Sequence, residues 1–368
     1  MQPKKTCSIL ICLCITSVLF LTAGIVLIGM WEVLYDYIVK GNLILKPDSP
    51  AFKIWIKNPL PLTLKLFVYN WTNPQEIYKK GEKSNITWNA NNTVTFKHLK
   101  KWYFDPERSN GSLYDAVTSI NPVALSAAYA TRTWSYMGRK TFSITFDAMI
   151  SSIYITKSVG NVLFDGYDDP LMNIANTFPF LAGNNFPPMD KFGWFYGRNG
   201  SEDYEGSFNM DTGVWGQLGE LYEWKYANHT PYYRDKCGGL SKVSAGEFFP
   251  TNLRNDTLIK FFSADLCRYV ELEFEKEETV HGITGYKYSA NDRFLDNGTK
   301  IPENKCFCDG DCMPSGALNV SACRYGSPAF VSLPHFYKAD PYYRDIVEGV
   351  APDAEKHDFF MTFEPGRT

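Results

Sequence analysis

The cysteines of this chain are the residues whose spacing could indicate a chemical role, either as metal ligands or in disulfides. Three cysteines stand close together in the segment Cys306-Phe-Cys308-Asp-Gly-Asp-Cys312. Cys308 and Cys312 have a zinc-like spacing, whereas Cys306 and Cys308 are too close together to form a usual ligand pair. The two intervening aspartates lack the ligand ladder and the closing glutamate of a calcium loop. Thiolate ligands also require reduced cysteines, so disulfides are favoured if this segment lies in an oxidising compartment.

The histidines give no comparable catalytic signal. None belongs to a His-Glu-x-x-His zinc motif, and the sequence has no obvious glycine pattern of a nucleophile elbow. A Ser-His-Asp triad leaves no linear trace, because its members meet only in the fold. We expect a protein that is not an enzyme and that uses no metal and no cofactor. The five histidines are His98, His229, His281, His335 and His357.

The N-terminal segment indicates the compartment. Residues 7–31 contain no charged side chain and supply the roughly twenty apolar residues that span a bilayer. A cleaved signal peptide is the alternative, but the stretch is too long and shows no obvious small-residue cleavage site. Lys4 and Lys5 precede it while Glu32 and Asp36 follow it, so the positive-inside rule places the N-terminus in the cytosol. The expected organisation is a cytosolic tail at 1–6, an uncleaved signal-anchor helix at 7–31 and an extracellular or luminal domain at 32–368.

Two counts agree with this orientation. Nine N-glycosylation sequons all follow the apolar segment, at Asn70, Asn85, Asn91, Asn110, Asn199, Asn228, Asn255, Asn297 and Asn319. Six cysteines, an even number, also follow it, at Cys237, Cys267, Cys306, Cys308, Cys312 and Cys323. The sequence therefore predicts a disulfide-bonded, membrane-anchored glycoprotein. With a net charge of −3, the chain lacks the excess of basic residues by which proteins bind nucleic acids electrostatically.

Hydrophobic periodicity predicts strands at both ends of the ectodomain and helices between them. Apolar and polar residues alternate at 62–69 and again at 270–275, as in half-buried strands. Asn121 as N-cap and Pro122 in the first turn predict the start of a helix at 123–137, which Gly138 closes, and apolar residues continue at helical spacing over 142–153. No linker or repeat interrupts the chain, which favours one continuous domain.

Aromatic residues are frequent, with 26 Phe, 23 Tyr and 9 Trp. Core packing is their ordinary role. An ectodomain this aromatic could also line a lipid cavity, and composition alone does not choose between the two.

Eight short motifs run in order along nearly the whole chain. They are GNLILKP at 41–47, WIKNP at 55–59, VYNWTNP at 68–74, GYDDP at 166–170, FFSADLC at 261–267, CFC at 306–308, SLPHF at 332–336 and FEP at 363–365. Together they resemble the class B scavenger receptor family, which includes fatty-acid translocase, croquemort, the lysosomal integral membrane protein and the sensory neuron membrane proteins.

The resemblance implies a mixed α+β, β-dominated fold. Its expected form is a large antiparallel β-barrel-like ectodomain with a helical apical bundle, here at about 115–200, and a lipid tunnel leading toward the membrane. An N-terminal transmembrane helix precedes it. In the family the ectodomain continues past the Glu-Pro segment to a second transmembrane helix, so we expect the C-terminal part of the fold to be missing from a chain that stops at Thr368.

The resemblance also implies a function. The first expectation is a receptor that binds and takes up lipids, lipoprotein particles or other hydrophobic ligands at the plasma membrane. The alternatives are a trafficking receptor of the lysosomal or endosomal membrane whose apex carries a protein cargo, and a sensory co-receptor for hydrophobic odorants. The cytosolic C-terminal tail, where a lysosomal sorting signal would sit, lies outside this sequence.

Two sets of residues gain expected roles from the resemblance. The cysteine pairs that it implies are Cys237–Cys306, Cys267–Cys323 and Cys308–Cys312, although spacing alone permits fifteen pairings of six cysteines. Basic residues in or near the helical insert form either ordinary solvated surface or an apical patch for anionic ligands. They are Arg139, Lys140, Lys157, Lys191 and Arg198.

We expect several of the sequons to carry glycans. Glycosidase treatment of the membrane-expressed protein should lower its apparent mass by several glycan equivalents, because the ectodomain faces away from the cytosol in the predicted topology. Gel mobility before and after treatment measures this. An unchanged mass would contradict the orientation, and a soluble mature N-terminus near Trp31 would contradict the uncleaved anchor.

Overall fold

The computed structural model describes residues 3–59, 62–66, 75–148, 152–177, 189–251, 253–308 and 312–365. It divides into two compact units, Met1–Lys53 and Ile54–Thr368. We describe each unit by itself.

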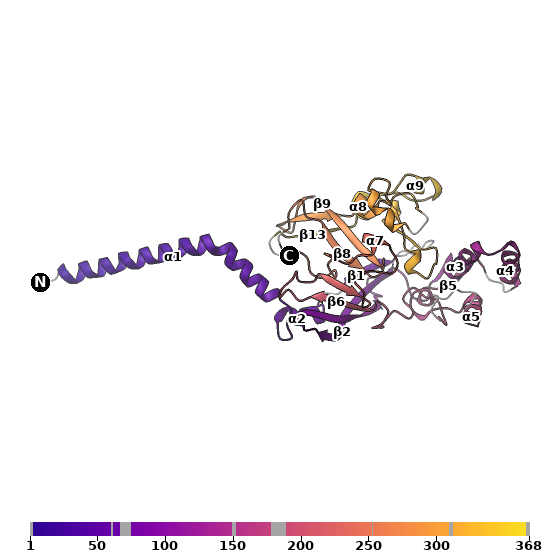
Figure 1. Cartoon of the computed structure of the whole chain (residues 1–368), viewed down its shortest axis with the longest axis horizontal. Coiled ribbons are helices and arrows are strands. Elements are labelled where there is room, and N and C mark those ends of the chain that lie inside the picture. Colours follow the sequence, from indigo (N-terminus) through magenta and orange to yellow (C-terminus); the bar gives the residue numbers. More distant parts are fainter. Residues whose placement is uncertain are drawn as a thin grey trace. The chain divides into compact units, whose positions relative to one another are not determined.

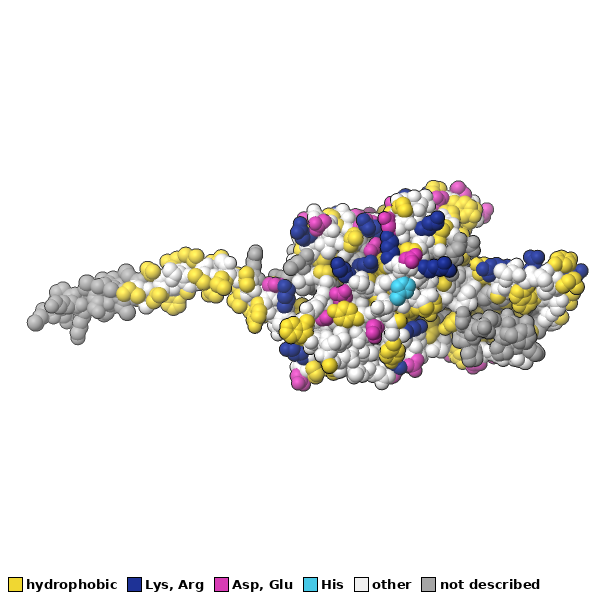
Figure 2. All heavy atoms as spheres, in the orientation of Figure 1, with side chains coloured by type: hydrophobic (Ala, Val, Ile, Leu, Met, Phe, Trp, Pro, Cys, Tyr) yellow, Lys and Arg dark blue, Asp and Glu magenta, His cyan; other side chains and the backbone are white. Residues whose placement is uncertain are grey.

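The first unit consists mainly of one long apolar helix, α1 (Pro3–Leu43), which contains the predicted anchor segment. Large apolar side chains remain exposed along it, including Leu19, Phe20, Ile25 and Ile28 (Figure 2). Within the described residues no single helix is long and apolar enough to cross a bilayer, but the pair Ile15–Trp31 and Val33–Leu43, bent by 55°, reaches that length and composition together. The anchor at 7–31 stays a prediction.

Two antiparallel sheets build most of the second unit (Figure 1). The five-stranded sheet has the order β1 (Leu62–Leu66), β2 (Gln75–Trp88), β3 (Thr93–Phe104), β6 (Ser207–Asp211) and β7 (Leu221–Trp224). The four-stranded sheet has the order β13 (Phe360–Phe363), β10 (Ile283–Ser289), β9 (Arg268–Val280) and β8 (Ile259–Ser263). The fold is thus mixed and rich in antiparallel sheet, as the resemblance implies.

Ser244 joins the two sheets. It forms a bridge to Glu220 beside β7 and a parallel bridge to Phe261 on β8. Its N–H donates to the carbonyl of Lys260 at 2.9 Å, and its own carbonyl accepts from the N–H of Phe262 at 2.8 Å. The strands therefore follow one another from β1 to β13 through the segment at Ser244.

Alternating side chains place the core between these strands. Val270 and Leu272 on β9 are buried as the period of two predicts, and Leu272 packs with Ile259 and Tyr288 in one apolar cluster. Ile77 on β2 and Trp102 on β3 lie in a second cluster. Burying each large side chain contributes on the order of 2 kcal/mol. The period-two segment predicted at 62–69 forms β1 over Leu62–Leu66, and residues 67–69 lie outside the described residues.

The helices of the central insert lie at one end of the second unit (Figure 1). Its elements are β4 (Ala116–Ile120), α3 (Pro122–Ala130), η1 (Thr131–Thr133), α4 (Tyr136–Ala148), β5 (Tyr154–Ser158), η2 (Asn161–Asp165) and α5 (Pro170–Thr177). Asn121 caps α3 by accepting from the N–H groups of Val123 and Ala124, as its place before Pro122 favours.

The prediction of a single helix at 123–137 is wrong, because this segment forms α3, η1 and the start of α4. It divides at Thr131, whose hydroxyl donates to the carbonyl of Ala128 at 2.9 Å, and Trp134 is extended with ψ of 158°. A threonine that hydrogen-bonds back to the backbone competes with helix propagation. Gly138 consequently lies inside α4 rather than closing a helix, and Ile153 lies beyond the end of α4.

Short helices and strands connect and follow the sheets. They are α2 (Pro50–Ile56), α7 (Asp235–Gly238), α8 (Asp292–Leu295), η3 (Pro302–Phe307), β11 (Ala317–Asn319), η4 (Ser321–Cys323), β12 (Phe330–Ser332), η5 (Pro334–Phe336), α9 (Tyr342–Ile346) and α10 (Ala354–His357). Three disulfides hold this part of the chain together: Cys237–Cys306, Cys267–Cys323 and Cys308–Cys312. They are the pairs that the family resemblance implies.

Candidate functional site

The pairing of β2 with β3 decides which side chains enter the interior. In this register Lys79 stands opposite Trp102, and Lys83 stands opposite His98. Trp102 is buried with Ile77, so this side of the hairpin is the inner face of the sheet. The inner face changes along its length from apolar residues at Trp102 to basic residues at His98 and Lys83.

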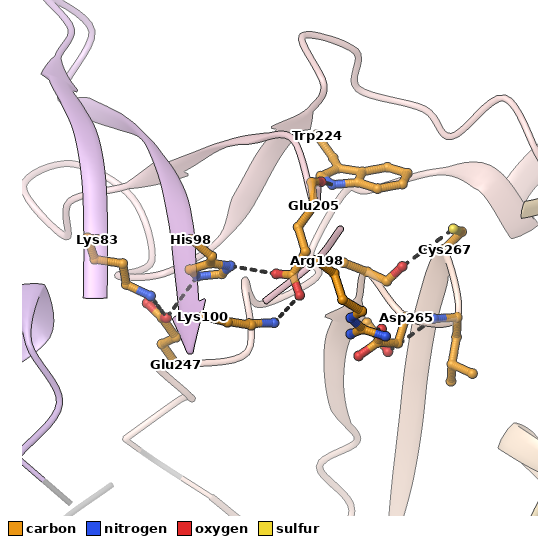
Figure 3. A network of polar contacts seen from close by, with 12 residues as sticks. Lys83, His98, Lys100, Arg198, Glu205, Trp224, Glu247, Asp265 and Cys267 are labelled. Carbon is orange, nitrogen blue, oxygen red and sulfur yellow. Dashed lines mark hydrogen bonds and ion pairs between the residues drawn. The ribbon is translucent and has the colours of Figure 1, made fainter. Parts of the chain in front are cut away.

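Two carboxylates from later loops meet these basic side chains (Figure 3). Nδ1 of His98 lies 3.0 Å from Oε2 of Glu205, and its Nε2 lies 3.2 Å from Oε1 of Glu247. Lys83 forms an ion pair with Glu247, and Lys100 forms one with Glu205. We call these five residues the interior polar cluster.

Charges of opposite sign alternate along the interior polar cluster. Each ring nitrogen of His98 faces one carboxylate, and each carboxylate also pairs with a lysine. The side chains are largely shielded from solvent, with exposed fractions of 5% for Glu205, 13% for His98 and 9% for Lys83. Such an arrangement is stable only if every member keeps its partner.

Two tryptophans complete the hydrogen bonds of the carboxylate residues. Nε1 of Trp55 donates to Oε2 of Glu247 at 2.6 Å, and Nε1 of Trp224 donates to the backbone carbonyl of Glu205 at 2.8 Å. Aromatic rings line the same space, since Phe208 stacks on Phe96 with ring centroids 5.7 Å apart. The cluster is therefore bounded by apolar walls, which strengthens the interactions between its charges.

The environment holds both glutamates in the charged form. Burial by itself would raise the pKa of Glu205, but the hydrogen bond from His98 and the charge of Lys100 outweigh it and lower the pKa to about 2. For Glu247 burial is likewise outweighed, by the charge of Lys83 and the hydrogen bond from His98, and the pKa falls to about 2. Burial lowers the pKa of Lys83, and its pair with Glu247 opposes that effect.

The predicted apical residues are spread over several elements. Arg139 and Lys140 are exposed on α4, and Lys157 on β5 lies with its amine 5.8 Å from the ring centroid of Tyr167. Lys191 is partly buried. Whether these residues bind a ligand stays a prediction.

Arg198 is held in a different environment. Its Nη2 lies 2.9 Å from Oδ1 of Asp265, and its guanidinium carbon lies 5.0 Å from the ring centroid of Trp102 and 4.8 Å from that of Tyr204. Arg324 also contacts Asp265, at 3.7 Å. These contacts give Arg198 a structural role beside the inner face of the sheet.

The sequons differ in how their amides are used. Asn199 and Asn297 donate their side-chain N–H groups to the carbonyls of Trp102 and Met313. The side chain of Asn319, on β11, accepts from the N–H of Ser321. Asn85, Asn91, Asn110, Asn199, Asn228 and Asn255 are exposed residues, the amide of Asn85 donates to Oε2 of Glu202 at 3.0 Å, and Asn70 lies outside the described residues. Which of the sequons carry glycans stays a prediction.

Sequence reasoning missed the interior polar cluster. His98 stood among scattered histidines, and its partners follow it by 107 and 149 residues. The alternation of β2 and β3 could have placed Lys83 and His98 on one face, but no motif marks Glu205 or Glu247. No group of three or more His, Cys, Asp and Glu side chains in the described part of the chain could hold a metal ion. A hollow on the opposite face of the sheet is lined by Lys57, Lys80, Glu82, Leu99, Lys101 and Tyr103.

Comparison with known proteins gives consistent matches along the chain. The model of the CD36 family matches residues 15–367. Protein peste of Drosophila melanogaster is 35% identical over 367 residues, which are 94% of this chain and 65% of that protein. Scavenger receptor class B member 1 of Mus musculus is 29% identical, with 95% of this chain and 70% of that protein covered. Lysosome membrane protein 2 of Mus musculus is 28% identical, with 96% and 74% covered. The chain thus spans 65% to 74% of the length of these three relatives.

Replacing one carboxylate tests the interior polar cluster. Glu247→Gln should destabilise the fold by on the order of 3 kcal/mol, because Lys83 is left buried without its counter-ion. Glu82→Gln is the matched control, since the Lys57–Glu82 pair is exposed and should contribute less than about 1 kcal/mol. Denaturant unfolding of both variants measures the difference. Equal losses would mean that the cluster contributes no more than a surface pair.

Acid should weaken the fold through the same carboxylates. Each has a pKa of about 2 in the folded protein, below the ordinary value of 4.5, so the folded state binds fewer protons than the unfolded state in this interval. Their contribution is present above about pH 4.5 and is lost as the pH falls toward 2. Thermal midpoints measured across this range should fall more steeply for the native protein than for Glu247→Gln. Parallel profiles would show that Glu247 does not carry the acid dependence.

Proposed function

The chain belongs to the CD36 family, and from this membership we propose that it is a membrane-anchored glycoprotein receptor that binds and takes up lipids, lipoproteins or other hydrophobic ligands. The single observation that carries the proposal is the family match over residues 15–367. The resemblance to class B scavenger receptors that the motifs indicate is confirmed by the same match and by the relatives. Passage of lipid through an internal tunnel belongs to the proposal.

Anchoring by α1 is the second part of the proposal. Its apolar side chains are exposed over many turns, and burial in lipid would remove that surface from water. The bend between Ile15–Trp31 and Val33–Leu43 makes a broken span of sufficient length. With the N-terminus in the cytosol, the second unit and its disulfides would lie in an oxidising compartment.

Recognition of anionic particles at the apex is the third part. Arg139 and Lys140 are exposed on α4, and Lys157 lies on β5, which pairs with β4 in the same insert. Exposed cations attract anionic surfaces at distances limited by the Debye length, about 8 Å at physiological salt. Their positions support a basic surface on the helical insert, while Arg198 is engaged by Asp265.

A trafficking receptor of the lysosomal membrane is the second candidate function. The observation that favours it is the similarity to Lysosome membrane protein 2 along 96% of this chain. In that case the helical insert would carry a protein cargo in place of a lipoprotein particle. We propose the plasma membrane as the principal location and the lysosomal membrane as the alternative, since the chain matches Scavenger receptor class B member 1 and Lysosome membrane protein 2 to nearly the same extent, at 29% and 28% identity.

Lipid binding by the detergent-solubilised full chain tests the first proposal. A long-chain fatty acid or sterol should bind saturably with a negative heat-capacity change, which marks the burial of apolar surface. Isothermal titration at several temperatures measures it. Absence of saturable binding for every lipid class would favour the trafficking receptor.

Binding of anionic vesicles tests whether basic residues of the helical insert recognise anionic particles. The double variant Lys140→Glu/Lys157→Glu should bind anionic phospholipid vesicles less well, and added salt should weaken the native interaction. Lys242→Glu/Lys356→Glu is the matched control, because both lysines are exposed and outside the insert. Equal binding by the two double variants would remove Lys140 and Lys157 from the ligand site.

A further inference from the structure

The loop between β6 and β7 exposes a tryptophan. Trp215 has an exposed fraction of 85%, the highest of any tryptophan in the part of the chain that the structure describes, and Val214 beside it is also exposed. A single exposed apolar side chain needs no explanation by itself. Here, however, the loop is tightly held, and other exposed apolar side chains lie at the same end of the second unit.

Asp211 fixes the conformation of this loop. Its carboxylate accepts from the N–H of Gly213 at 2.6 Å and from the hydroxyl of Tyr222 at 2.8 Å. The loop closes so tightly over this carboxylate that a Cβ at Gly216 would collide with it. Trp215 is therefore presented on a backbone that is already ordered, and less conformational freedom is lost when its ring binds a partner.

The loop lies close to the residues with which the second unit begins. Ile54 is the first residue of that unit and is exposed. The indole N–H of the next residue, Trp55, donates to Oε2 of Glu247 at 2.6 Å. Phe248 follows Glu247 and packs on Gly219 of the loop, where an added Cβ would lie 2.6 Å from the Cβ of Phe248. The β6–β7 loop and the start of the unit are thus neighbouring segments.

A second hairpin with exposed apolar residues is connected to the same region. Val280 and Ile283 pair directly across the turn between β9 and β10, and both are exposed. Phe249 packs against Phe363 of β13, with ring centroids 4.9 Å apart, and Phe363 pairs with Tyr286 on β10. Figure 1 shows α2 and β13 at one end of the second unit. Three segments therefore expose apolar side chains there.

We propose that this end of the second unit contacts the lipid bilayer, with Trp215 inserted at the membrane–water interface. The proposal rests on the proposed anchoring by α1. Only residues 44–53 separate the end of α1 at Leu43 from Ile54, and even a fully extended chain of that length reaches about 40 Å at most. Tryptophan suits the interface because its ring is apolar while its indole N–H can still find a hydrogen-bond partner.

Oxidation of the native full chain in phosphatidylcholine nanodiscs tests the contact without a mutation. Hydroxyl radicals oxidise the tryptophans that water reaches, and peptide mass spectrometry measures each one. Trp194 is the internal reference, since it is 55% exposed and its N–H donates to the carbonyl of Val162 in the central insert. In water alone Trp215 would be oxidised faster than Trp194. In the nanodiscs we expect Trp215 to be oxidised at least about fivefold more slowly.

Brominated phosphatidylcholine identifies the bilayer as the partner. Bromine on the acyl chains quenches the emission of tryptophans that approach them. Trp215→Ala should reduce the quenched part of the emission, whereas the matched control Trp194→Ala should leave it unchanged. Both side chains are exposed, so neither substitution should alter the fold, and denaturant unfolding checks this. Trp31→Phe reports on the anchor, because Trp31 ends the predicted span.

The outcomes separate this inference from the proposed anchoring. Quenching of Trp31 with rapid oxidation and no quenching of Trp215 would overturn the interfacial contact and leave the anchor intact. Quenching of Trp215 without quenching of Trp31 would support the contact and overturn anchoring by α1. Slow oxidation of Trp215 without quenching would mean that a protein surface covers it, and this too would overturn the contact with lipid.

Discussion

The compensation of positive charge on the inner face of β2 and β3 is the constraint on which the second unit depends. Two lysines and a histidine enter a space walled by aromatic rings, where charges without partners are destabilising. Glu205 stands just before β6, and Glu247 stands between β7 and β8. Satisfying the charges therefore fixes the loops before β6 and before β8 against β3. The sheet and these two loops therefore have to reach their native positions together.

The same face also combines two kinds of surface. Near Trp102 it is apolar and near Lys83 it is charged, with Lys79 at the boundary between them. The interior polar cluster and the apolar cluster around Trp102 therefore adjoin along one sheet face, and both are closed off from solvent.

The sequence was most informative where the determinants were local. Alternation over Val270 and Leu272 predicted a half-buried strand, and Asn121 before Pro122 marked the start of α3. The prediction of one continuous helix failed at Thr131, because the side-chain hydrogen bond of this residue competes with the helix. Hydrophobic periodicity carries no information about such a bond. The interior polar cluster could not be predicted, since the partners of His98 are distant acidic residues that stand in no motif and are brought together only by the pairing of strands.

The long sequence separations within the interior polar cluster also affect the order of events during protein synthesis. Glu247 follows Lys83 by 164 residues, and Glu205 follows His98 by 107. At about 5–20 residues per second, Lys83 is made roughly 10–30 s before its partner. During that interval the β2–β3 hairpin must keep its charged groups hydrated and its inner face open. The inner face of this hairpin is therefore completed only when residues 205 and 247 have been synthesised.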